Sequence, residues 1–221
     1  DVSTTIVLSE AEKQMLEDRG VNGLITIPLI REIKRPTEAP FARRHGALFI
    51  GGYPHTPNID AVKWLVDDIW PAVRKLTKER GLASVPLHIY GSRMPDSFRN
   101  FAAEDIHVHG FAPDLREIYN SVRLSVAPLR FGAGLKGKLA TSFIYGVPVV
   151  GTDIAFEGVN NATLLEGSSS PDKVDMIAAH IVETHFMQEK WQRIRAASID
   201  HANDQYSTGG VTKRIIKALE G

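Results

Sequence analysis

The sequence predicts an α/β fold with a doubly wound, mostly parallel, Rossmann-like sheet. From residue 47 onward, short apolar runs that end in Gly or Pro alternate with stretches of helical pattern. A strand, a glycine-rich loop and a helix follow one another over residues 124–145, which is the arrangement that α/β folds use to bind phosphate groups. Alternating strands and helices predict a parallel sheet covered on both faces.

The composition is typical of a globular protein and excludes several function classes. The 221 residues are 43% hydrophobic and 24% charged, and 26 Lys and Arg balance 26 Asp and Glu. A zero net charge does not favour non-specific binding to nucleic acid, so no nucleic-acid partner is expected. The lack of cysteine excludes disulfides, thiolate nucleophiles and cysteine-based zinc sites, and it fits a reducing, cytoplasmic compartment.

Two short strands and a helix are predicted ahead of the main domain. The run Thr4–Leu8 is β-branched and apolar, as a strand is, and Leu24–Ile27 is similar. Between them, Ser9 and Glu12 form the S-x-x-E pattern of a capping box at a helix start. Residues 31–44 are rich in charge and proline, with little periodicity, which indicates a linker.

The main domain is predicted to alternate strands with helices. Strands are expected at Ala47–Ile50, Leu87–Tyr90, Ile106–Val108, Leu124–Ala127, Val147–Val150 and Thr163–Leu165. Helices are expected at Ile59–Arg80 (kinked at Pro71), Pro95–Ala103, Pro113–Asn120, Lys138–Tyr145, Pro171–Thr184, Met187–Gln205 and Thr208–Leu219. Ligands in such sheets bind at the carboxyl ends of the strands, near the switch point of the strand order.

The glycine-rich loop permits two general interpretations. Residues 132–137 match G-x-G-x-x-G, and Asp153 follows the next strand where an acid would bind a ribose, so a nicotinamide-dependent oxidoreductase is one alternative. The unit nevertheless comes late in the chain, after several strands. Residues 132–138 also fit the P-loop pattern G-x-x-x-x-G-K, but Leu139 follows where that loop needs Ser or Thr to bind Mg²⁺.

A third interpretation comes from a longer match. The segment PLRFGAGLKGKLATSFIYGVPVV resembles the donor-site loop and helix of GT-B glycosyltransferases of the large family-four, or group 1, type. ALFIGGYPHTPNIDAVKWLVDDIWPAV resembles the first strand, loop and helix of their donor domain, and LHIYGS followed by IHVHGFAPDLREIYNSVRLSVAPL resembles its middle. VSTTIVLSEAEKQML and ITIP resemble the end of their amino-terminal domain, so the similarity runs from Val2 to Glu166 in the family's order.

This resemblance implies a donor-binding domain for a nucleoside-diphosphate sugar, one half of a GT-B fold. The base is expected near residues 109–112, the diphosphate at backbone N–H groups of Gly134 and Leu135, and positive charge from Lys136, Lys138 and Arg130. Arg130 and Lys136 would stabilise the leaving group. The residues implied for donor binding are Gly51, Gly52, Gly91, His109, Gly110, Phe111, Ala112, Arg130, Gly134, Leu135, Lys136, Lys138 and Thr141.

The resemblance also implies a reaction without a cofactor. Basic side chains often take the place of a metal ion in this family, so no metal is expected and the nucleotide sugar is a substrate. The sugar would be transferred to an acceptor hydroxyl, with retention of anomeric configuration as in family members. The sequence does not name the sugar, the base or the acceptor, which can be a glycan, lipid or protein.

The sequence departs from the family pattern at three places. Thr141 stands where many members have a glutamate that holds the donor ribose, and Ala133 stands where another glutamate often lies near the sugar. The loop at residues 53–58 lacks the Arg and Lys that often follow the first strand. A non-catalytic nucleotide- or partner-binding domain is therefore the second alternative.

The other candidate residues favour structural roles. His107 and His109 alternate on one predicted strand and would share a face, but no nearby Cys or acid completes a metal site. Trp64, Trp70 and Trp191 lie on helical stretches and are expected to pack. No Ser-His-Asp or Cys-His set is recognisable, so no catalytic residue beyond the leaving-group stabilisers is assigned.

Taken together, the patterns predict four segments. Residues 1–29 would end an amino-terminal acceptor domain, 30–46 would be a linker, 47–205 the donor domain and 206–221 a terminal crossover helix. The chain starts at Asp1 and shows no signal-like segment, so we expect a piece of a longer protein whose amino-terminal domain lies upstream. As in many family members, the expected location is cytoplasmic, with a peripheral position at the inner face of a membrane as one form of it.

Overall fold

The computed structural model describes residues 4–8, 10–27, 31–33, 36–132, 137–165, 168–169 and 173–220. Its main sheet contains β3 Ala47–Gly52, β4 Leu87–Ser92, β5 Ile106–Gly110, β6 Leu124–Ala127, β7 Val149–Thr152 and β8 Ser168–Ser169. These strands lie in the order β5-β4-β3-β6-β7-β8, and each neighbouring pair is parallel. The predicted doubly wound α/β fold is confirmed.

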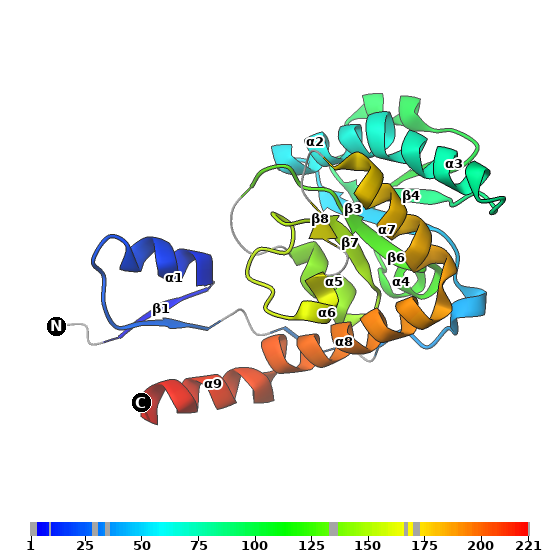
Figure 1. Cartoon of the computed structure of the whole chain (residues 1–221). Helices are drawn as coiled ribbons and strands as arrows, with labels where there is room; N and C mark the ends of the chain where they lie inside the picture. Colours follow the sequence, from blue (N-terminus) through cyan, green and yellow to red (C-terminus); the bar gives the residue numbers. More distant parts are fainter. Residues whose placement is uncertain are drawn as a thin grey trace.

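Helices cover both faces of this sheet (Figure 1). They are α2 Thr56–Trp64, α3 Trp70–Glu79, α4 Arg116–Ser121, α5 Gly137–Ile144, α6 Ala162–Leu165, α7 Val174–Phe186 and α8 Gln188–Tyr206; α9 Thr208–Glu220 follows α8 and extends away from the sheet. Side chains of successive strand residues point to opposite faces, so Phe49 packs with α2, α3 and α7, whereas Leu48 packs with Tyr119 of α4. Among the described residues, no helix is both long enough and apolar enough to cross a bilayer.

The first described residues form a small unit of their own. β1 Thr5–Val7 and β2 Leu24–Thr26 pair in parallel, with α1 Glu10–Glu17 between them. Figure 1 shows this unit beside the main body, with α9 extending on the same side. Ser9 of the predicted capping box lies outside the described residues, and Glu12 accepts a hydrogen bond from the Leu8 N–H at 2.9 Å. The division of the chain into four segments stays a prediction.

Three predicted elements differ in kind from those observed. The run Thr163–Leu165 was expected as a strand but belongs to α6, because Asn161 Oδ1 accepts the Leu164 N–H and starts a helix there; the strand β8 follows at Ser168. The predicted helix at 95–103 is a 3₁₀ helix, η3 Asp96–Phe101. The kink expected at Pro71 takes the form of a π-helical turn, η2 Leu65–Ile69, since proline cannot continue the hydrogen-bond ladder of the preceding helix.

The predicted linker is anchored to the main body by one buried arginine. Arg44 is 1% exposed, and its guanidinium donates to the carbonyls of Ala39 (2.7 Å), Tyr119 (2.9 Å) and Val122 (3.3 Å) and to the Thr37 hydroxyl (2.7 Å). Burial, with a smaller contribution from Arg195, lowers the pKa of Arg44 to about 10, so it stays charged at neutral pH. The segment before β3 is thereby joined to the end of α4.

We expect Arg44→Met to lower the free energy of unfolding by about 2–4 kcal/mol, because it strands several buried carbonyl acceptors while keeping most of the side-chain volume. Arg43→Met, on an exposed neighbour, is the matched control and should change stability little. Urea denaturation of both variants measures the difference. Equal stability of the two would contradict the anchoring role of Arg44.

A second buried polar contact depends on a neutral histidine. His185, at the end of α7, is fully buried, and its Nε2 accepts the Gly46 N–H at 3.0 Å. Burial, followed by the nearby charges of Arg123 and His45, lowers the pKa of His185 to about 3. Since a protonated Nε2 could not accept this hydrogen bond, the fold selects the neutral ring.

Stability should therefore fall as the pH is lowered from about 6.5 toward 4. In the unfolded chain this histidine takes up a proton near pH 6.5, whereas in the folded chain it does so only near pH 3, so acid favours unfolding by up to roughly 1 kcal/mol per pH unit. His185→Gln keeps an acceptor but does not titrate, and should flatten this dependence in thermal melts from pH 7 to 4.5. An unchanged slope would show that His185 is not responsible.

Candidate functional site

The candidate site lies at the carboxyl ends of the strands where the strand order reverses. The chain runs from β3 outward to β4 and β5 on one side, then returns to β6 on the other side of β3. The connections after β3 and β6 therefore leave the sheet edge in opposite directions and open a crevice between them. Every described residue of the implied donor site comes from a strand end or loop at this edge, except those in the first turns of α5.

Glycines at the ends of β3 and β4 form the floor of the crevice. Gly51 pairs with Gly91 and Gly52 with Ser92, so both strands extend beyond the predicted ends. A Cβ atom on Gly91 would lie 2.0 Å from the Gly51 carbonyl oxygen, and one on Gly51 would lie 2.9 Å from Asn58 Cγ. Any side chain at these positions would collide with its neighbours, so the floor is made of backbone.

Two adjoining hollows occupy this crevice. The first, of about 290 Å³, has Phe111, Ala112, Leu115 and Tyr119 on one wall and Thr141 on another. The second, of about 340 Å³, is lined on its far side by His55, Pro57, Asn58, Phe131 and Gly132. Both share Ile50, Gly51, Gly52, Gly137 and Lys138, so they form one continuous cleft.

The implied donor residues within the described chain gather at this cleft with three exceptions. Gly51, Gly52, Phe111, Ala112, Lys138 and Thr141 line it directly, together with Gly91. Arg130, His109 and Gly110 do not belong to its described lining; His109 and Gly110 line an adjoining hollow instead. Gly134, Leu135, Lys136 and the departure at Ala133 lie outside the described residues.

The two described cations of the site have different partners. The Arg130 guanidinium donates to both carboxylate oxygens of Asp60, with Nε at 2.9 Å from Oδ2, and lies 5.2 Å from the centre of the Trp64 ring. The Asp60 carboxylate raises the pKa of Arg130. Lys138 instead donates to the neutral amide oxygen of Asn58 and lies 4.7 Å from the centre of the Phe49 ring. The sequence did not reveal either partner, each of which is at least 70 positions away.

Thr141 keeps only part of its hydrogen-bonding capacity for a ligand. Its hydroxyl donates to the Gly137 carbonyl one turn earlier in α5, at 2.9 Å. The hydroxyl oxygen can still accept hydrogen bonds. Toward the first hollow, Thr141 therefore acts as a neutral acceptor.

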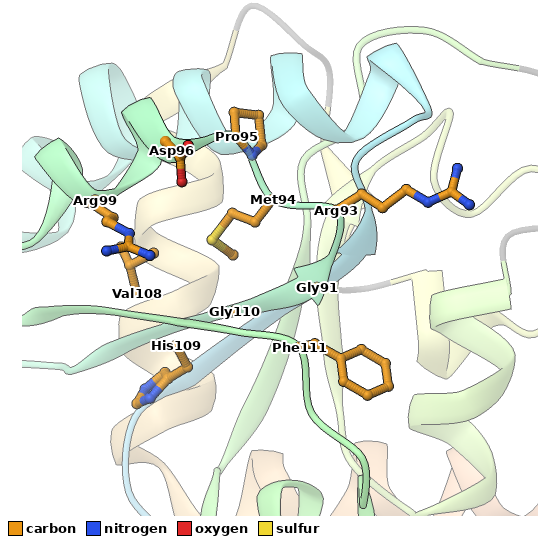
Figure 2. Close-up of a pocket in the computed structure, with 10 residues that line it drawn as sticks. All are labelled: Gly91, Arg93, Met94, Pro95, Asp96, Arg99, Val108, His109, Gly110 and Phe111. Atoms are coloured by element: carbon orange, nitrogen blue, oxygen red, sulfur yellow. The ribbon is translucent and has the colours of Figure 1, made fainter.

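A third hollow of about 440 Å³ lies beside the first and shares Gly91 and Phe111 with it (Figure 2). Arg93, Arg99 and Asp96 line it, and sequence reasoning missed all three. Arg93 has φ +52°, the only left-handed conformation of a non-glycine residue in the described chain. Figure 2 shows the Phe111 ring, which is 72% exposed, directed away from His109.

His109 belongs to a stack of rings. β5 has a bulge at this residue, because Ile89 pairs with Val108 and Tyr90 with Gly110. The His109 ring stacks on Tyr90 with centroids 4.3 Å apart, and its Nε2 lies 3.0 Å from His88 Nδ1; His107 stacks on His88. Burial and the adjacent histidines lower the pKa of His88 to about 4. Among the described residues, no group of three or more His, Asp or Glu side chains is arranged to hold a metal ion.

Comparison with known proteins agrees with the fold. The model of the family described as Glycosyl transferases group 1 matches residues 44–185. Similar solved structures include a mutant of S. aureus TarM in complex with Fondaparinux, alpha-GlcNAc-glycerol and UDP (TM-score 0.75, 17% identity, 100% of this chain and 44% of that one). A second is the pneumococcal O-GlcNAc transferase GtfA in complex with UDP and GlcNAc (TM-score 0.66, 20% identity, 99% of this chain and 45% of that one). A third is Anabaena Alr3699/HepE in complex with UDP and glucose (TM-score 0.71, 11% identity, 100% of this chain and 63% of that one).

The similar structures are longer than this chain. The chain spans 44% to 63% of the length of the three similar structures. No match was found among curated protein sequences. At identities of 11% to 20%, the solved structures establish the fold, which is one half of a GT-B fold.

The floor of the cleft provides a direct test of its packing. We expect Gly91→Ala to destabilise the chain by roughly 2 kcal/mol or more, because its Cβ would overlap the Gly51 carbonyl and the Tyr53 ring. Gly209→Ala makes the same change at a helical site with open space around it, and should be neutral or slightly stabilising. Chemical denaturation of the two variants compares them. A Gly91→Ala chain as stable as the parent would refute the close approach of β3 and β4.

Proposed function

Because the chain belongs to the group 1 glycosyl transferase family, we propose that its main body binds a nucleoside-diphosphate sugar whose sugar is transferred to an acceptor hydroxyl. The observation that carries this proposal is the continuous cleft at the switch point of the sheet. Its floor is the glycine backbone at the ends of β3 and β4 together with the Asn58 amide, one wall is an exposed aromatic ring, and Lys138 lies where the cleft's two hollows meet. A planar base, a sugar and a charged diphosphate need these three environments.

The proposed arrangement assigns one part of the donor to each hollow. The base would lie in the first hollow against Phe111 and Ala112, with Thr141 accepting a hydrogen bond from a ribose hydroxyl. The diphosphate would lie between the two hollows at Lys138, and the sugar in the second hollow. When the glycosidic bond breaks, negative charge grows on the diphosphate, and an ammonium group held at that place lowers the energy of the charged leaving group.

We propose that the rest of the enzyme supplies the acceptor site. The chain is shorter than the similar transferases, and the small β1-α1-β2 unit would be the end of an upstream domain. On this proposal the present chain binds nucleotide weakly and transfers no sugar. Cytoplasmic location, retention of configuration and independence from metal remain part of the proposal.

The two alternative functions make different predictions. A dinucleotide fingerprint follows the first strand of its sheet, whereas the glycine-rich loop here follows β6, the fourth strand of the main sheet in sequence, so an NAD enzyme is disfavoured. A non-catalytic nucleotide- or partner-binding domain would share the cleft but would fail to support transfer even when joined to its upstream part. Thr141, which lacks the family's carboxylate, is the observation that favours this alternative.

We expect a ligand-observed NMR screen against UDP, GDP, ADP and NAD to detect binding of a nucleoside diphosphate. UDP is the first candidate because the similar structures contain it. Phe111→Ala should weaken that binding roughly 5- to 100-fold through loss of stacking on the base. Met176→Ala, which removes an exposed apolar side chain on α7, is the control and should bind as the parent does. Binding of NAD alone, or of none of the four, would contradict the proposed function.

A further inference from the structure

Asn58 occupies an unusual place at the floor of the cleft. It lies in the first turn of α2, six residues after the end of β3, and its side chain reaches back over that strand end. Its Nδ2 donates to the Gly52 carbonyl at 2.7 Å, and its Oδ1 accepts from the Lys138 ammonium. One amide thus joins the end of β3 to the first turn of α5.

The orientation of this amide follows from its partners. A backbone carbonyl can only accept a hydrogen bond, and a lysine ammonium can only donate. The NH₂ group of Asn58 must therefore face Gly52, and its oxygen must face Lys138. The contact with Gly52 fixes the direction in which the oxygen points.

Gly51 is shaped by this asparagine. A Cβ on Gly51 would approach Asn58 Cγ to 2.9 Å and Nδ2 to 3.1 Å. The missing side chain at position 51 thus provides the space that the Asn58 amide occupies beside the strand. Glycine at position 51 therefore has two effects: it leaves room for the Asn58 side chain, and it lets a ligand approach the backbone.

We propose that Asn58 is a positioning residue for Lys138, which it holds toward the diphosphate of a bound nucleotide. This inference rests on the proposed function and deepens it. A lysine side chain loses rotamer entropy when it is fixed, and a protein that fixes it before binding removes that cost from ligand binding. Asn58 does so with a neutral group, so it adds no negative charge beside the phosphates, whereas the partner of Arg130 is a carboxylate.

The alternative is that Asn58 merely links α2 to α5. A link of that kind would affect all ligands of the cleft and the stability of the fold equally. Positioning of Lys138 affects only ligands that carry phosphate, and only while Lys138 is present. These two differences determine the experiment.

The test is a double-mutant cycle of Asn58→Ala and Lys138→Ala, with UDP and uridine titrated calorimetrically (GDP and guanosine if the parent selects guanine). We expect Asn58→Ala to weaken binding of the diphosphate roughly 3- to 10-fold and to leave binding of the nucleoside unchanged. In the Lys138→Ala background, Asn58→Ala should have no further effect. Asn58→Asp, which nearly keeps the volume but adds a negative charge, should weaken diphosphate binding more than Asn58→Ala.

Asn100→Ala, an exposed asparagine of η3, is the matched control and should bind both ligands as the parent does. Thermal unfolding of each variant shows that it is folded, and Asn58→Asp carries the test should Asn58→Ala be unstable. Equal weakening of diphosphate and nucleoside, or full additivity of the two alanine substitutions, would overturn the positioning role while leaving the proposed function intact. A parent chain that binds no nucleoside diphosphate would overturn both.

Discussion

The close approach of β3 and β4 at their carboxyl ends is the constraint on which the rest of the site depends. Gly51 and Gly91 pair there, with no room for a Cβ on either. The space that these glycines leave is filled by two nearby side chains: Asn58 of α2 beside Gly51, and Tyr53, the residue after β3, beside Gly91, with its ring packed against Phe98 of η3. Glycine at these strand ends lets a ligand approach the backbone closely, and Asn58 and Tyr53 occupy the space beside it.

The alternation of strands and helices could be predicted from the sequence because it depends on features of neighbouring residues. Proline at helix starts, glycine after strands and continuous apolar runs are dictated by backbone geometry, and they located the strands from β3 to β7 and all of the longer helices. The error at Thr163–Leu165 arose because three residues of β-branched and apolar type are too few to distinguish a buried strand from a helical turn. The Asn161 cap immediately before them was the signal that could have decided the matter.

The candidate site was predictable in its backbone and not in its side-chain partners. The cleft-lining residues Gly51, Gly52 and Lys138 could be named from sequence because the resemblance to a GT-B donor domain runs through the contiguous segments that contain them. The partners Asp60 for Arg130 and Asn58 for Lys138 could not, because they depend on how α2 crosses the end of β6 and α5. The bulge that turns His109 onto Tyr90 and His88 is likewise a property of the paired strands, and no pattern within β5 alone announces it.

The neutral Asn58 amide beside Lys138 bears on the departures from the family pattern. Position 141 lies three residues after Lys138 on α5, on the same side of the helix, where a glutamate would place a carboxylate close to the ammonium. Thr141 offers an acceptor oxygen without that charge, and Asn58 does the same from α2. The threonine therefore does not by itself argue for an inactive site. The Thr141 hydroxyl keeps an acceptor for a ribose, and the Asn58 amide holds Lys138 without placing a carboxylate beside a diphosphate.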